Sequence, residues 1–358
     1  MKKHCTLYIE NCTLKEIPII VLNWNGLEDT LACMASLKQQ TYTDFKVYLA
    51  DNGSEKSDVS TLKARFADDP QVVLSFNATN LGFTKAHNLL FEKLLQEEYS
   101  YIVTLNNDTT QEPDWLENLI AFAHEKKADM VSSKMVNFFD RTKMDNAGHR
   151  MLNTAEIIPL ASGEPIENWN APFKNFGPCA GAALYSTAMM RDIGIFDERF
   201  STGYEDAEYG VRASILGYTS WYVPKAVVYH KVSASINKVL DYEYKLNIQE
   251  HIFYTYYKLM PKALQWINFP SFVFKYTAIF GIDIILRRKV FYKVMKEAWR
   301  RTLRDNKSEI STARQKFYGS HQPMSTWRIW RMQTFFLWFD IQRFWKFVVV
   351  GEKSFLER

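Results

Sequence analysis

Short apolar runs alternate with amphipathic stretches along the first hundred residues. Four apolar runs each stop in turn-forming residues: IPIIVLNWNG at 17–26, FKVYLADNGS at 45–54, QVVLSFN at 71–77 and YIVTLNND at 101–108. Apolar residues recur at helical spacing in the stretches between them, at 28–40, 58–67 and 84–99. Strands that alternate with helices of this length predict an α/β fold with a doubly wound, mainly parallel sheet.

Polar residues collect where three of these strands end. The strand ends read NWNG, ADNGS and NNDTT, and ligands of doubly wound sheets bind outside the carboxyl ends of the strands. One such end is most simply a turn, because Asn, Asp and Gly favour turns. Three of them on one edge favour a binding site over three unrelated turns.

The pattern divides the chain into three parts. Residues 1–16 are an N-terminal extension, residues 17–235 an α/β domain, and residues 236–358 a helical region. Late in the α/β domain the sequence predicts a strand with a short helix, an amphipathic helix and a further strand, at 177–200, 204–218 and 221–230. Trp24, beside the first loop, is interpreted as a core residue.

The helical region mixes aromatic and basic residues. Lys275 and Asp283 interrupt its most apolar stretch, so no transmembrane span is expected. Its last part predicts an amphipathic interfacial helix with these tryptophans and cations: Trp327, Trp330, Trp338, Trp345, Arg328, Arg331, Arg343 and Lys346. Such a helix suits peripheral membrane contact, here through 265–350, and also a packing face on the α/β domain or on a second subunit, as in a homodimer.

Composition narrows the class of protein and its compartment. The chain has 358 residues and a net charge of +4, too small to indicate nucleic acid as a partner. Its cysteines show neither metal-binding spacing nor a disulfide framework, which favours a reducing compartment. The N-terminus shows no apolar signal segment. We therefore expect a cytoplasmic protein, peripheral on the inner face of the cell membrane.

The chain lacks the P-loop, Rossmann, zinc-protease and serine-hydrolase motifs. What remains is a set of carboxylates and one histidine at predicted strand and helix ends: Asp51, Asp108, Glu205, Asp206, Glu208 and His230. Acidic residues in a first helical turn also stabilise the helix dipole, and for Glu208 this structural explanation is as good as any. His230 taken alone is more simply a satisfied polar residue.

Six stretches, in order along 17–232, resemble the inverting glycosyltransferases of family 2, which have the nucleotide-sugar-binding GT-A fold. IIVLNWNG resembles the opening strand, LADNGS the nucleotide-contacting turn and NLGFTKAHN the glycine loop over the donor. LNND resembles the D-x-D metal motif, and the stretch from GPCAGAAL to YEDAEYG resembles the acceptor-side loop and the catalytic E-D motif. His230 matches a histidine that completes the metal site in some members. Rhamnosyltransferase-like and galactofuranosyltransferase-like members resemble this sequence most.

The resemblance implies a nucleotide-diphosphate sugar as donor. It divides the α/β domain into a nucleotide-binding half, 17–110, and an acceptor-side half, 111–235. It assigns contact with the donor to these residues: Asn23, Asn25, Asp51, Asn80, Gly82, Asn88, Asn106 and Asn107. Asp51 resembles the residue that binds the pyrimidine N–H, and it also fits an Asx-turn cap. Gly82 would let the backbone approach phosphate or sugar.

The implied cofactor is a divalent metal, Mn²⁺ or Mg²⁺. A hard cation neutralises the departing diphosphate and prefers oxygen ligands, and the resemblance makes Asp108 one of them. Asn106 stands where a complete D-x-D has its first aspartate, and an amide holds a cation less well than a carboxylate does. His230 would supply the missing ligand, and an imidazole favours manganese somewhat over magnesium.

The implied reaction is a single displacement that inverts the anomeric carbon. A carboxylate must accept the proton of the attacking hydroxyl, and the E-D motif makes Asp206 that base, with Glu205 as the alternative. The resemblance suggests a dTDP- or UDP-sugar, rhamnose first, and a glycan or lipid-linked acceptor in surface polysaccharide synthesis. Two alternatives stay open: a catalytically silent glycan-binding or scaffolding relative, and a sugar nucleotidyltransferase. The stretch around 135–175, His149 included, carries no signature for sugar or acceptor.

Overall fold

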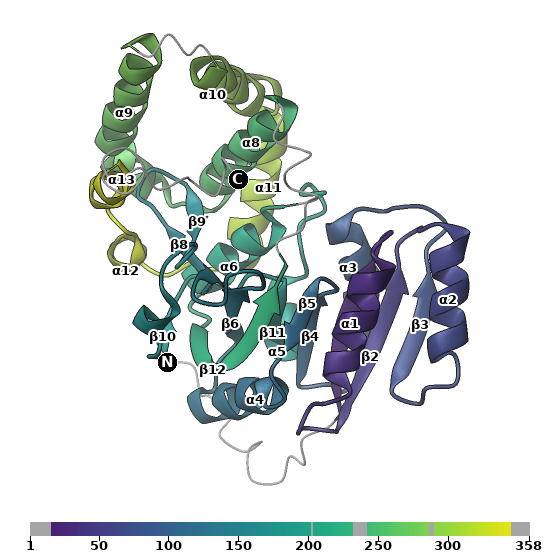
Figure 1. Ribbon diagram of the computed structural model, residues 1–358. Helices are drawn as coiled ribbons and strands as arrows, with labels where there is room; N and C mark the ends of the chain where they lie inside the picture. The colour runs from purple at the N-terminus through teal and green to yellow at the C-terminus, as the bar shows by residue number, and fades with distance from the viewer. Residues whose placement is uncertain (1–15, 202, 232–241, 286–289, 345–358) are drawn as a thin grey trace.

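The computed structural model describes residues 16–201, 203–231, 242–285 and 290–344 (Figure 1). The part before residue 231 is a central sheet with helices on its faces, and the part after residue 242 is helical. In Figure 1 the purple and blue N-terminal strands and helices lie to one side, and the green C-terminal helices gather above the teal second half of the sheet. The α/β fold predicted from the alternating pattern is confirmed.

The first half of the sheet is built from parallel strand–helix units. Its elements are β1 (Ile17–Asn23), α1 (Leu27–Leu37), β2 (Phe45–Asp51), α2 (Lys56–Phe66), β3 (Val72–Phe76), α3 (Phe83–Leu94) and β4 (Tyr101–Asn106). Strand β1 pairs in parallel with β2 and β4, and β2 pairs in parallel with β3. Their carboxyl ends therefore share one edge, as the sequence predicts.

The second half of the sheet is mixed. Its elements are β5 (Thr109–Gln111), α4 (Trp115–Lys126), β6 (Met130–Asn137), β7 (Met144–Asn146), β10 (Phe173–Lys174), β11 (Ala182–Ser186), α5 (Thr187–Ile193), α6 (Glu205–Leu216) and β12 (Ser220–His230). The order across the sheet is β10-β12-β6-β11-β4-β1-β2-β3, with β5 on β12 and β7 on β6. A separate hairpin joins β8 (His149–Met151) to β9 (Ile157–Pro159), and a 3₁₀ turn, η1 (Ile166–Asn168), follows it.

Strand β11 runs antiparallel between β4 and β6. Its first residue, Ala182, pairs with Leu105 near the end of β4, and the Asn106 N–H donates to Gly181 O at 2.9 Å. A Cβ on Gly181 would lie 3.1 Å from Nδ2 of the Asn106 side chain, so this position suits glycine. The antiparallel insertion therefore brings the loop 177–181 to the edge where the parallel strands end.

Two apolar layers cover the sheet. Side chains alternate along a strand, so Ile19 and Val21 of β1 join one layer and Ile20 joins the other. The first layer includes Trp115 of α4, and the second includes Tyr209 of α6. Helix α6 is therefore fixed on one face of the sheet by its own buried side chains.

The loop 177–181 also touches α6 backbone to backbone. A Cβ on Gly177 would lie 2.5 Å from the Gly210 Cα, and a Cβ on Gly210 would lie 2.6 Å from the Gly177 Cα. Two glycines are needed where chain and helix approach this closely. Ser214 Oγ donates to Phe176 O at 2.7 Å and adds a polar contact at the same junction.

The C-terminal helices are α8 (Tyr242–Leu259), α9 (Lys262–Ile285), α10 (Val290–Arg300), the π-helical turn η2 (Arg301–Asp305), α11 (Lys307–Ser320), α12 (Thr326–Met332) and α13 (Phe336–Phe344). Leu246 and Phe253 of α8 belong to the same buried cluster as Val211 of α6. A shared core therefore extends across the predicted boundary between 17–235 and 236–358, and that division stays a prediction.

The single amphipathic helix expected near 327–346 is interrupted. Helix α12 ends at Met332 and α13 begins at Phe336. Between them Thr334 N donates to Met151 O at 2.8 Å and Thr334 O accepts from Asn153 N at 3.0 Å, so pairing with the β8 hairpin replaces helical hydrogen bonds. Trp345 and Lys346 lie outside the described residues. Within the described residues, no helix is both long and apolar enough to cross a membrane.

Candidate active site

The ends of β1 and β2 meet in a hydrogen-bonded network. Asn23 and Asp51 are neighbours across the two strands, and both are buried. Asn23 Nδ2 donates to Asp51 Oδ2 at 2.8 Å and to Ser54 Oγ at 3.1 Å. Ser54 N donates to Asp51 Oδ1 at 3.0 Å, which forms the Asx turn expected in DNGS. Both carboxylate oxygens of Asp51 thus already accept hydrogen bonds from the protein.

The same network reaches the end of β4 through α1. The buried Thr30 hydroxyl donates to Asn23 Oδ1 at 2.8 Å and accepts from Asn107 Nδ2 at 2.9 Å. Asn25 has a left-handed backbone, φ 49°, and its Oδ1 accepts from Glu55 N at 3.0 Å. Three of the predicted donor-binding asparagines are therefore held together by one chain of contacts.

Asn52 fixes the glycine loop to the end of β2. Its Nδ2 donates to Asn80 Oδ1 at 3.0 Å and to Gly82 O at 3.3 Å, and its Oδ1 accepts from Leu81 N at 3.1 Å. Gly82 has φ +78°, a left-handed conformation that glycine adopts without strain. The loop therefore lies beside Asp51, at the same sheet edge as the network.

Asn88 takes part in a different contact. It is buried in α3, where Nδ2 donates to Phe196 O at 3.0 Å and lies 3.4 Å from Glu198 Oε1. Thr84 of the same helix donates to Phe200 O. These bonds hold α3 against the segment that leads into α6. Asn88 Nδ2 is therefore occupied inside the protein, away from the strand-end network, while Asn88 Oδ1 is buried without a hydrogen-bond partner among the described residues.

Asp108 lies just after β4 and faces His230, the last residue of β12. His230 Nε2 is 3.3 Å from Asp108 Oδ1, and His230 Nδ1 is 2.8 Å from Asp145 Oδ2. Strand β12 pairs with β5, which places His230 opposite Thr109 and next to Asp108. A histidine that binds a carboxylate through one nitrogen and turns the other toward a ligating oxygen has the arrangement of an oriented metal ligand.

The two carboxylates determine the charge of His230. Burial alone lowers the pKa of His230, but the hydrogen bonds to Asp108 and Asp145 outweigh it and raise that pKa to about 10. Among the described residues, no group of three His, Cys, Asp or Glu side chains has the geometry of a complete metal site. Asp108 would offer an anionic oxygen, and His230 a ring nitrogen once a cation displaces its Nε2 proton, which fits a divalent cation that also takes ligands from its substrate.

The E-D motif begins helix α6. Tyr204, just before it, has φ +81°, a strained conformation for a residue other than glycine. Asp206 is half-buried, and its Oδ2 accepts from Ala180 N at 2.9 Å, so this carboxylate is turned toward the loop 177–181. Glu205 is 5% exposed, and its buried Oε2 has no hydrogen-bond partner among the described residues.

Burial gives Glu205 and Asp206 different chemical properties. Desolvation first, and then the nearby charge of Asp206, raise the pKa of Glu205 to about 8. Near neutral pH Glu205 is then mostly protonated, and a protonated carboxyl group cannot accept a proton. Asp206 is the more exposed of the two and is oriented by a backbone N–H, so it is the better candidate for a base.

Glu208 has a structural role. It is fully buried, its Oε2 lies 3.0 Å from Arg212 Nη2, and its Oε1 lies 2.8 Å from Lys258 Nζ. Lys258, in α8, also lies 2.6 Å from Asp197 Oδ2. This ion network fastens α6 to α8. Glu208 therefore stabilises the structure through ion pairs with Arg212 and Lys258, in addition to the helix-dipole contact expected from the sequence.

The loop 177–181 lies between the two acidic groups. Burial raises the pKa of Cys179 in this loop well above its usual value, and the charges of Asp206, Asp145 and Glu205 raise it further. Burial lowers the pKa of His149, and the charge of Asp206 opposes that effect. The hydrogen bonds of this loop agree: Ala180 N donates to Asp206 at the start of α6, and Gly181 O accepts from Asn106 N, two residues before Asp108.

The comparison with protein families identifies the region that holds most of these groups. Residues 19–194 match the model of glycosyl transferase family 2, a span that runs from β1 to α5 and includes the strand ends, the glycine loop and Asp108. Residues 19–194 are a glycosyltransferase family 2 domain. The prediction of a glycosyltransferase of this family is confirmed.

Similar proteins are glycosyltransferases as well. The dTDP-rhamnosyl transferase RfbF of Shigella flexneri is 21% identical over 221 residues, 62% of this chain and 70% of that protein. The chondroitin synthase of Escherichia coli is 30% identical over 112 residues, 30% of this chain and 16% of that protein. The crystal structure of GalNAc-T7 with UDP, GalNAc and Mn²⁺ superposes with a TM-score of 0.55 at 11% identity, over 70% of this chain and 49% of that chain. The predicted GT-A fold is confirmed.

Three residues that the structure brings into the candidate site were not assigned from the sequence: Thr30, Asn52 and Asp145. Asn52 adjoins Asp51 in the turn that ends β2, so the polar turn itself was a usable signal. Thr30 gave no signal, because its role depends on α1 packing beside the ends of β1 and β4. Asp145 falls in the stretch around 135–175, which showed no pattern, and only the pairing of β6 with β7 and β12 brings it to His230.

Trp24 is not the core residue that the sequence predicted. Its side chain is 56% exposed. Strand β1 ends at Asn23, so Trp24 lies beyond the two apolar layers that cover the strand. The Trp24 indole is therefore exposed at the edge of the sheet, next to the network at the ends of β1 and β2.

Proposed function

We propose that this glycosyltransferase moves a sugar from a nucleotide-diphosphate donor to a hydroxyl group of a glycan or lipid-linked acceptor, with inversion of the anomeric carbon. A dTDP- or UDP-sugar is the proposed donor, with rhamnose as the first choice, because RfbF is a dTDP-rhamnosyl transferase. Surface polysaccharide synthesis is the proposed process. The observation that carries the proposal is that the loop 177–181 contacts both acidic groups: Ala180 N donates to Asp206 Oδ2, and Gly181 O accepts from the N–H of Asn106, two residues before Asp108.

The donor is proposed to lie along the ends of β1, β2 and β4. Of the predicted contacts, Asn25 and Asn80 are exposed, Asn106 and Asn107 are half-buried, and these amides remain accessible to a nucleotide. Gly82 offers a loop without a side chain beside them. The buried Asn23 and Asp51 are proposed to hold this surface in place, while buried Asn88 holds α3 against the segment before α6. A surface fixed before the donor binds needs no reorganisation during the reaction.

Asp108 and His230 are the residues that would hold a divalent metal, Mn²⁺ or Mg²⁺. Asp145 would keep the His230 ring in position through its bond to Nδ1. A bound cation supplies positive charge for the departing diphosphate. The imidazole favours manganese, and Mn²⁺ is the ion named with the GalNAc-T7 structure.

Asp206 is the proposed base. Its Oδ2 is held by Ala180 N, so Oδ1 is the atom proposed to take the acceptor proton while the acceptor oxygen attacks the anomeric carbon opposite the diphosphate. Glu205, protonated near neutral pH, would add no second negative charge beside it.

Peripheral contact with the inner face of the cell membrane is proposed for the C-terminal helices. Trp266, Trp327 and Trp338 are each more than half exposed on α9, α12 and α13. Indole rings with neighbouring cations are typical of helices that lie at a membrane interface.

Donor hydrolysis by the purified chain tests the function. A panel of dTDP- and UDP-sugars is incubated with Mn²⁺, Mg²⁺ or a chelator, using wild type, Asp108→Ala and the matched control Asp114→Ala, an exposed aspartate at the start of α4. We expect slow, metal-dependent release of one nucleotide by wild type and by the control, and a loss of about a thousandfold in Asp108→Ala, since metal stabilisation of the leaving group is worth several kcal/mol.

The other outcomes are equally informative. Neither hydrolysis nor metal-dependent nucleotide binding by wild type would contradict the proposal and favour the silent glycan-binding relative. Synthesis of a sugar nucleotide from a nucleoside triphosphate and a sugar phosphate would favour the nucleotidyltransferase. Equal rates for Asp108→Ala and wild type would remove Asp108 from the reaction.

A further inference from the structure

Two cavities adjoin each other among the C-terminal helices. The larger, of about 890 Å³, lies between α8, α9 and α10, and the smaller, of about 390 Å³, lies between the end of α8, the start of α9, η2 and α11. Tyr257, Lys262 and Gln265 line both. The cavities are therefore two parts of one binding surface, which we call the joined pocket.

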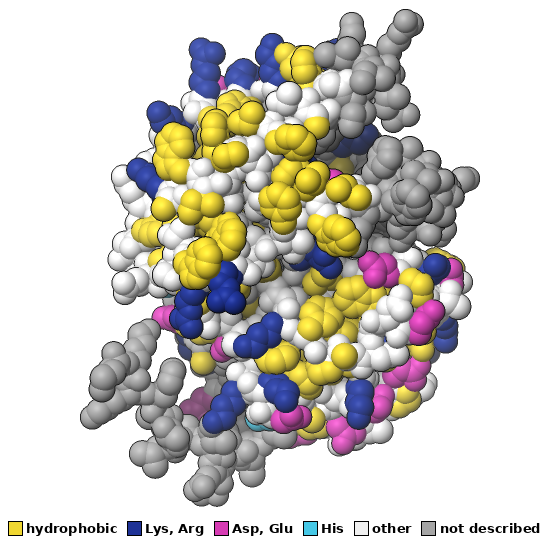
Figure 2. Space-filling view, turned by 90° about the vertical axis from the view of Figure 1, so that its left-hand side faces the viewer, with side chains coloured by type: hydrophobic (Ala, Val, Ile, Leu, Met, Phe, Trp, Pro, Cys, Tyr) yellow, Lys and Arg dark blue, Asp and Glu magenta, His cyan; other side chains and the backbone are white. Residues whose placement is uncertain are grey.

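The larger part of the joined pocket is an aromatic groove. Trp266, Phe269 and Phe280 of α9 face it on one side, and Trp299 of α10 faces it on the other. These side chains are 43 to 75% exposed, so the groove is open to solvent. Figure 2 shows hydrophobic side chains gathered on the upper half of the face where α9 lies, with Lys and Arg side chains around them. Aromatic surface of this extent is unfavourable in water unless something covers it.

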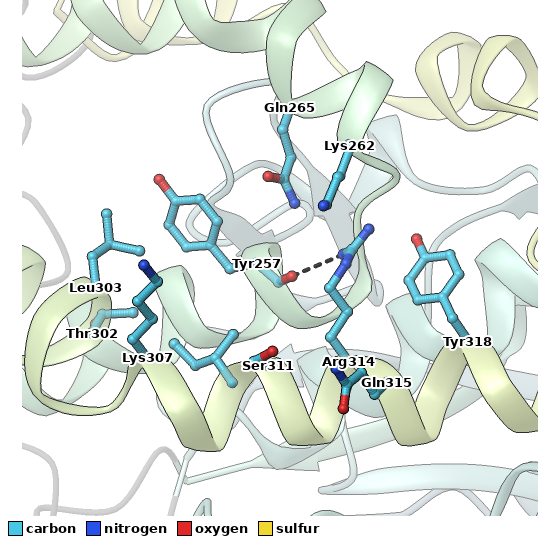
Figure 3. Close-up of a pocket in the computed structure, with 11 residues that line it drawn as sticks. Tyr257, Lys262, Gln265, Thr302, Leu303, Lys307, Ser311, Arg314, Gln315 and Tyr318 are labelled. Atoms are coloured by element: carbon cyan, nitrogen blue, oxygen red, sulfur yellow. Dashed lines mark hydrogen bonds between the residues drawn. The ribbon is translucent and has the colours of Figure 1, made fainter.

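The smaller part of the joined pocket is basic. Lys262 and Arg314 point toward one another across it from α9 and α11, and Lys307 lines it farther along α11 (Figure 3). Arg314 Nη1 donates to Tyr257 O at 2.9 Å and to Met260 O at 2.7 Å, which fixes its position at the end of α8.

These cations have no acidic partner in the part of the chain that the structure describes. None of the ion pairs there involves Lys262, Lys307 or Arg314. The carboxylates of the neighbouring helical turns pair with other arginines: Glu309 with Arg199, and Glu297 and Asp305 with Arg300. The basic part therefore has positive charge to offer an anion.

We propose that the joined pocket binds a membrane lipid with a phosphate headgroup, with the phosphate in the basic part and a hydrocarbon chain in the aromatic groove. The proposal deepens the membrane contact proposed above by giving it one site and one ligand class. The charge favours an anionic head, and the groove that begins at the same Lys262 favours an apolar tail continuous with it. A free phosphate would leave the groove empty, and an uncharged chain would leave the cations unpaired.

Binding of soluble amphiphiles to the full chain tests the joined pocket. Decyl phosphate, decanol and inorganic phosphate are titrated separately by calorimetry, all below micelle-forming concentrations. We expect saturable binding of decyl phosphate at a 1:1 ratio, and at least tenfold weaker binding of decanol and of inorganic phosphate. Lys262→Ala and Lys307→Ala should each weaken decyl phosphate about fivefold, the equivalent of about 1 kcal/mol per cation.

Lys316→Ala is the matched control, because Lys316 is an exposed lysine of the same helix α11 that lines neither cavity. It should bind decyl phosphate as wild type does. If Lys316→Ala weakened decyl phosphate binding as much as the pocket variants do, the binding would depend on general surface charge, and the proposal would be overturned. Equal affinity for decanol and decyl phosphate would make the groove a non-specific apolar surface and overturn it too.

Quenching by bromine-labelled chains tests the assignment of the tail. Vesicles of phosphatidylcholine with or without phosphatidylglycerol, brominated in the acyl chain, should quench tryptophan fluorescence only when the anionic lipid is present. Trp266→Phe and Trp299→Phe should each lose part of this quenching, while Trp24→Phe, at the edge of the sheet, should not. Unchanged quenching in both groove variants would overturn the assignment.

Two further measurements distinguish the lipid proposal from dimerisation and from the glycosyltransferase proposal. Sedimentation that shows a dimer in the absence of lipid, dissociated by Trp266→Asp, would make a second copy of the chain the occupant and overturn the lipid proposal. Donor hydrolysis is measured in the same preparations without lipid. It should be equal in wild type, Lys262→Ala and Lys307→Ala, so failure of the glycosyltransferase proposal and failure of the lipid proposal give different results.

Discussion

Both halves of the sheet place polar residues at the same edge, but the hydrogen bonding of these residues differs between the two halves. On the nucleotide-binding half, Asn23, Asp51 and Thr30 satisfy one another through hydrogen bonds of 2.8 Å. On the acceptor-side half, within the part of the chain that the structure describes, buried Glu205 has one carboxyl oxygen without a hydrogen-bond partner and buried His149 has an Nδ1 without one. The network of Asn23, Asp51 and Thr30 is closed, whereas these acceptor-side groups lie in unfavourable surroundings.

This difference distinguishes residues that stabilise the structure from residues that take part in the reaction. A fully satisfied polar network makes the structure rigid and defines one geometry. Groups with perturbed surroundings are those whose protonation can change during a reaction. The comparison therefore predicts that substitutions in the network of Asn23, Asp51 and Thr30 affect mainly stability, and that substitutions of Asp206 and of the Asp108–His230 pair affect mainly rate.

The largest effect is expected for Asp206→Asn. Without a base the acceptor proton has no recipient, so kcat for transfer should fall by about 10² to 10⁴, while donor binding stays within about twofold of wild type. Single-turnover kinetics with the donor and acceptor identified by the hydrolysis assay would measure it. Glu205→Gln is the control and should lose less than about tenfold. A larger loss in Glu205→Gln than in Asp206→Asn would exchange the two roles.

The next effect is expected for Asp145→Asn. The amide keeps the size of the side chain but weakens the partner that orients His230, so affinity for Mn²⁺ should fall about 10- to 100-fold. Electron paramagnetic resonance of free Mn²⁺ in the presence of nucleotide would measure the affinity directly. Asp140→Asn, in the same stretch, is the control with unchanged affinity. Wild-type affinity in Asp145→Asn would show that Asp145 does not position the ligand.

A smaller effect, and of another kind, is expected for Thr30→Val. The valine leaves Asn23 Oδ1 and Asn107 Nδ2 without their hydroxyl partner in a buried place, so the free energy of unfolding should fall by about 1–3 kcal/mol. Urea unfolding measures it. Thr61→Val is the control, because the Thr61 hydroxyl donates to Ser57 O of its own helix and, among the described residues, to no other group. If Thr30→Val kept full stability but lost much of its kcat, the division into stabilising residues and reacting residues would be contradicted.

The smallest effect is a pH slope caused by Glu205. Between its ordinary pKa of 4.5 and about 8, the folded chain keeps a proton on Glu205 that the unfolded chain has released. Stability must then fall as pH rises through this interval, by at most about 1.4 kcal/mol per pH unit. Glu205→Gln stays neutral, so urea unfolding across the interval should show a flatter slope than wild type. Parallel slopes would mean that Glu205 is ionised in the folded protein.

The sequence was sufficient for the local elements and their order. β1 to β4 and α1 to α3 follow from alternating apolar runs and from turn residues such as the DNGS that closes β2. Asp108 and His230 were paired from the resemblance, and the structure places their side chains 3.3 Å apart. Asp51 was given an Asx turn from its local sequence, and the Ser54 N–H supplies it.

Contacts between distant segments could not be predicted in this way. Strand β11 inserts antiparallel because of pairing with β4 and β6, which no local pattern specifies. The break between α12 and α13 depends on Thr334 meeting Met151 and Asn153, more than 180 residues earlier in the chain. Glu208 looked like any acidic residue in a first helical turn, because its partner Lys258 lies in another helix.

The ion network at Lys258 has a consequence for which acceptors can react. Lys258 binds Glu208, two residues after the proposed base, and the adjacent Tyr257 lines the joined pocket. With lipid in that pocket, α6 and the bilayer surface are connected through one rigid helix, so Asp206 stands at a constant height above the membrane. The distance between Asp206 and the membrane would then select the acceptor. An acceptor whose reactive hydroxyl lies much nearer to the membrane than Asp206, or much farther from it, could not reach the base.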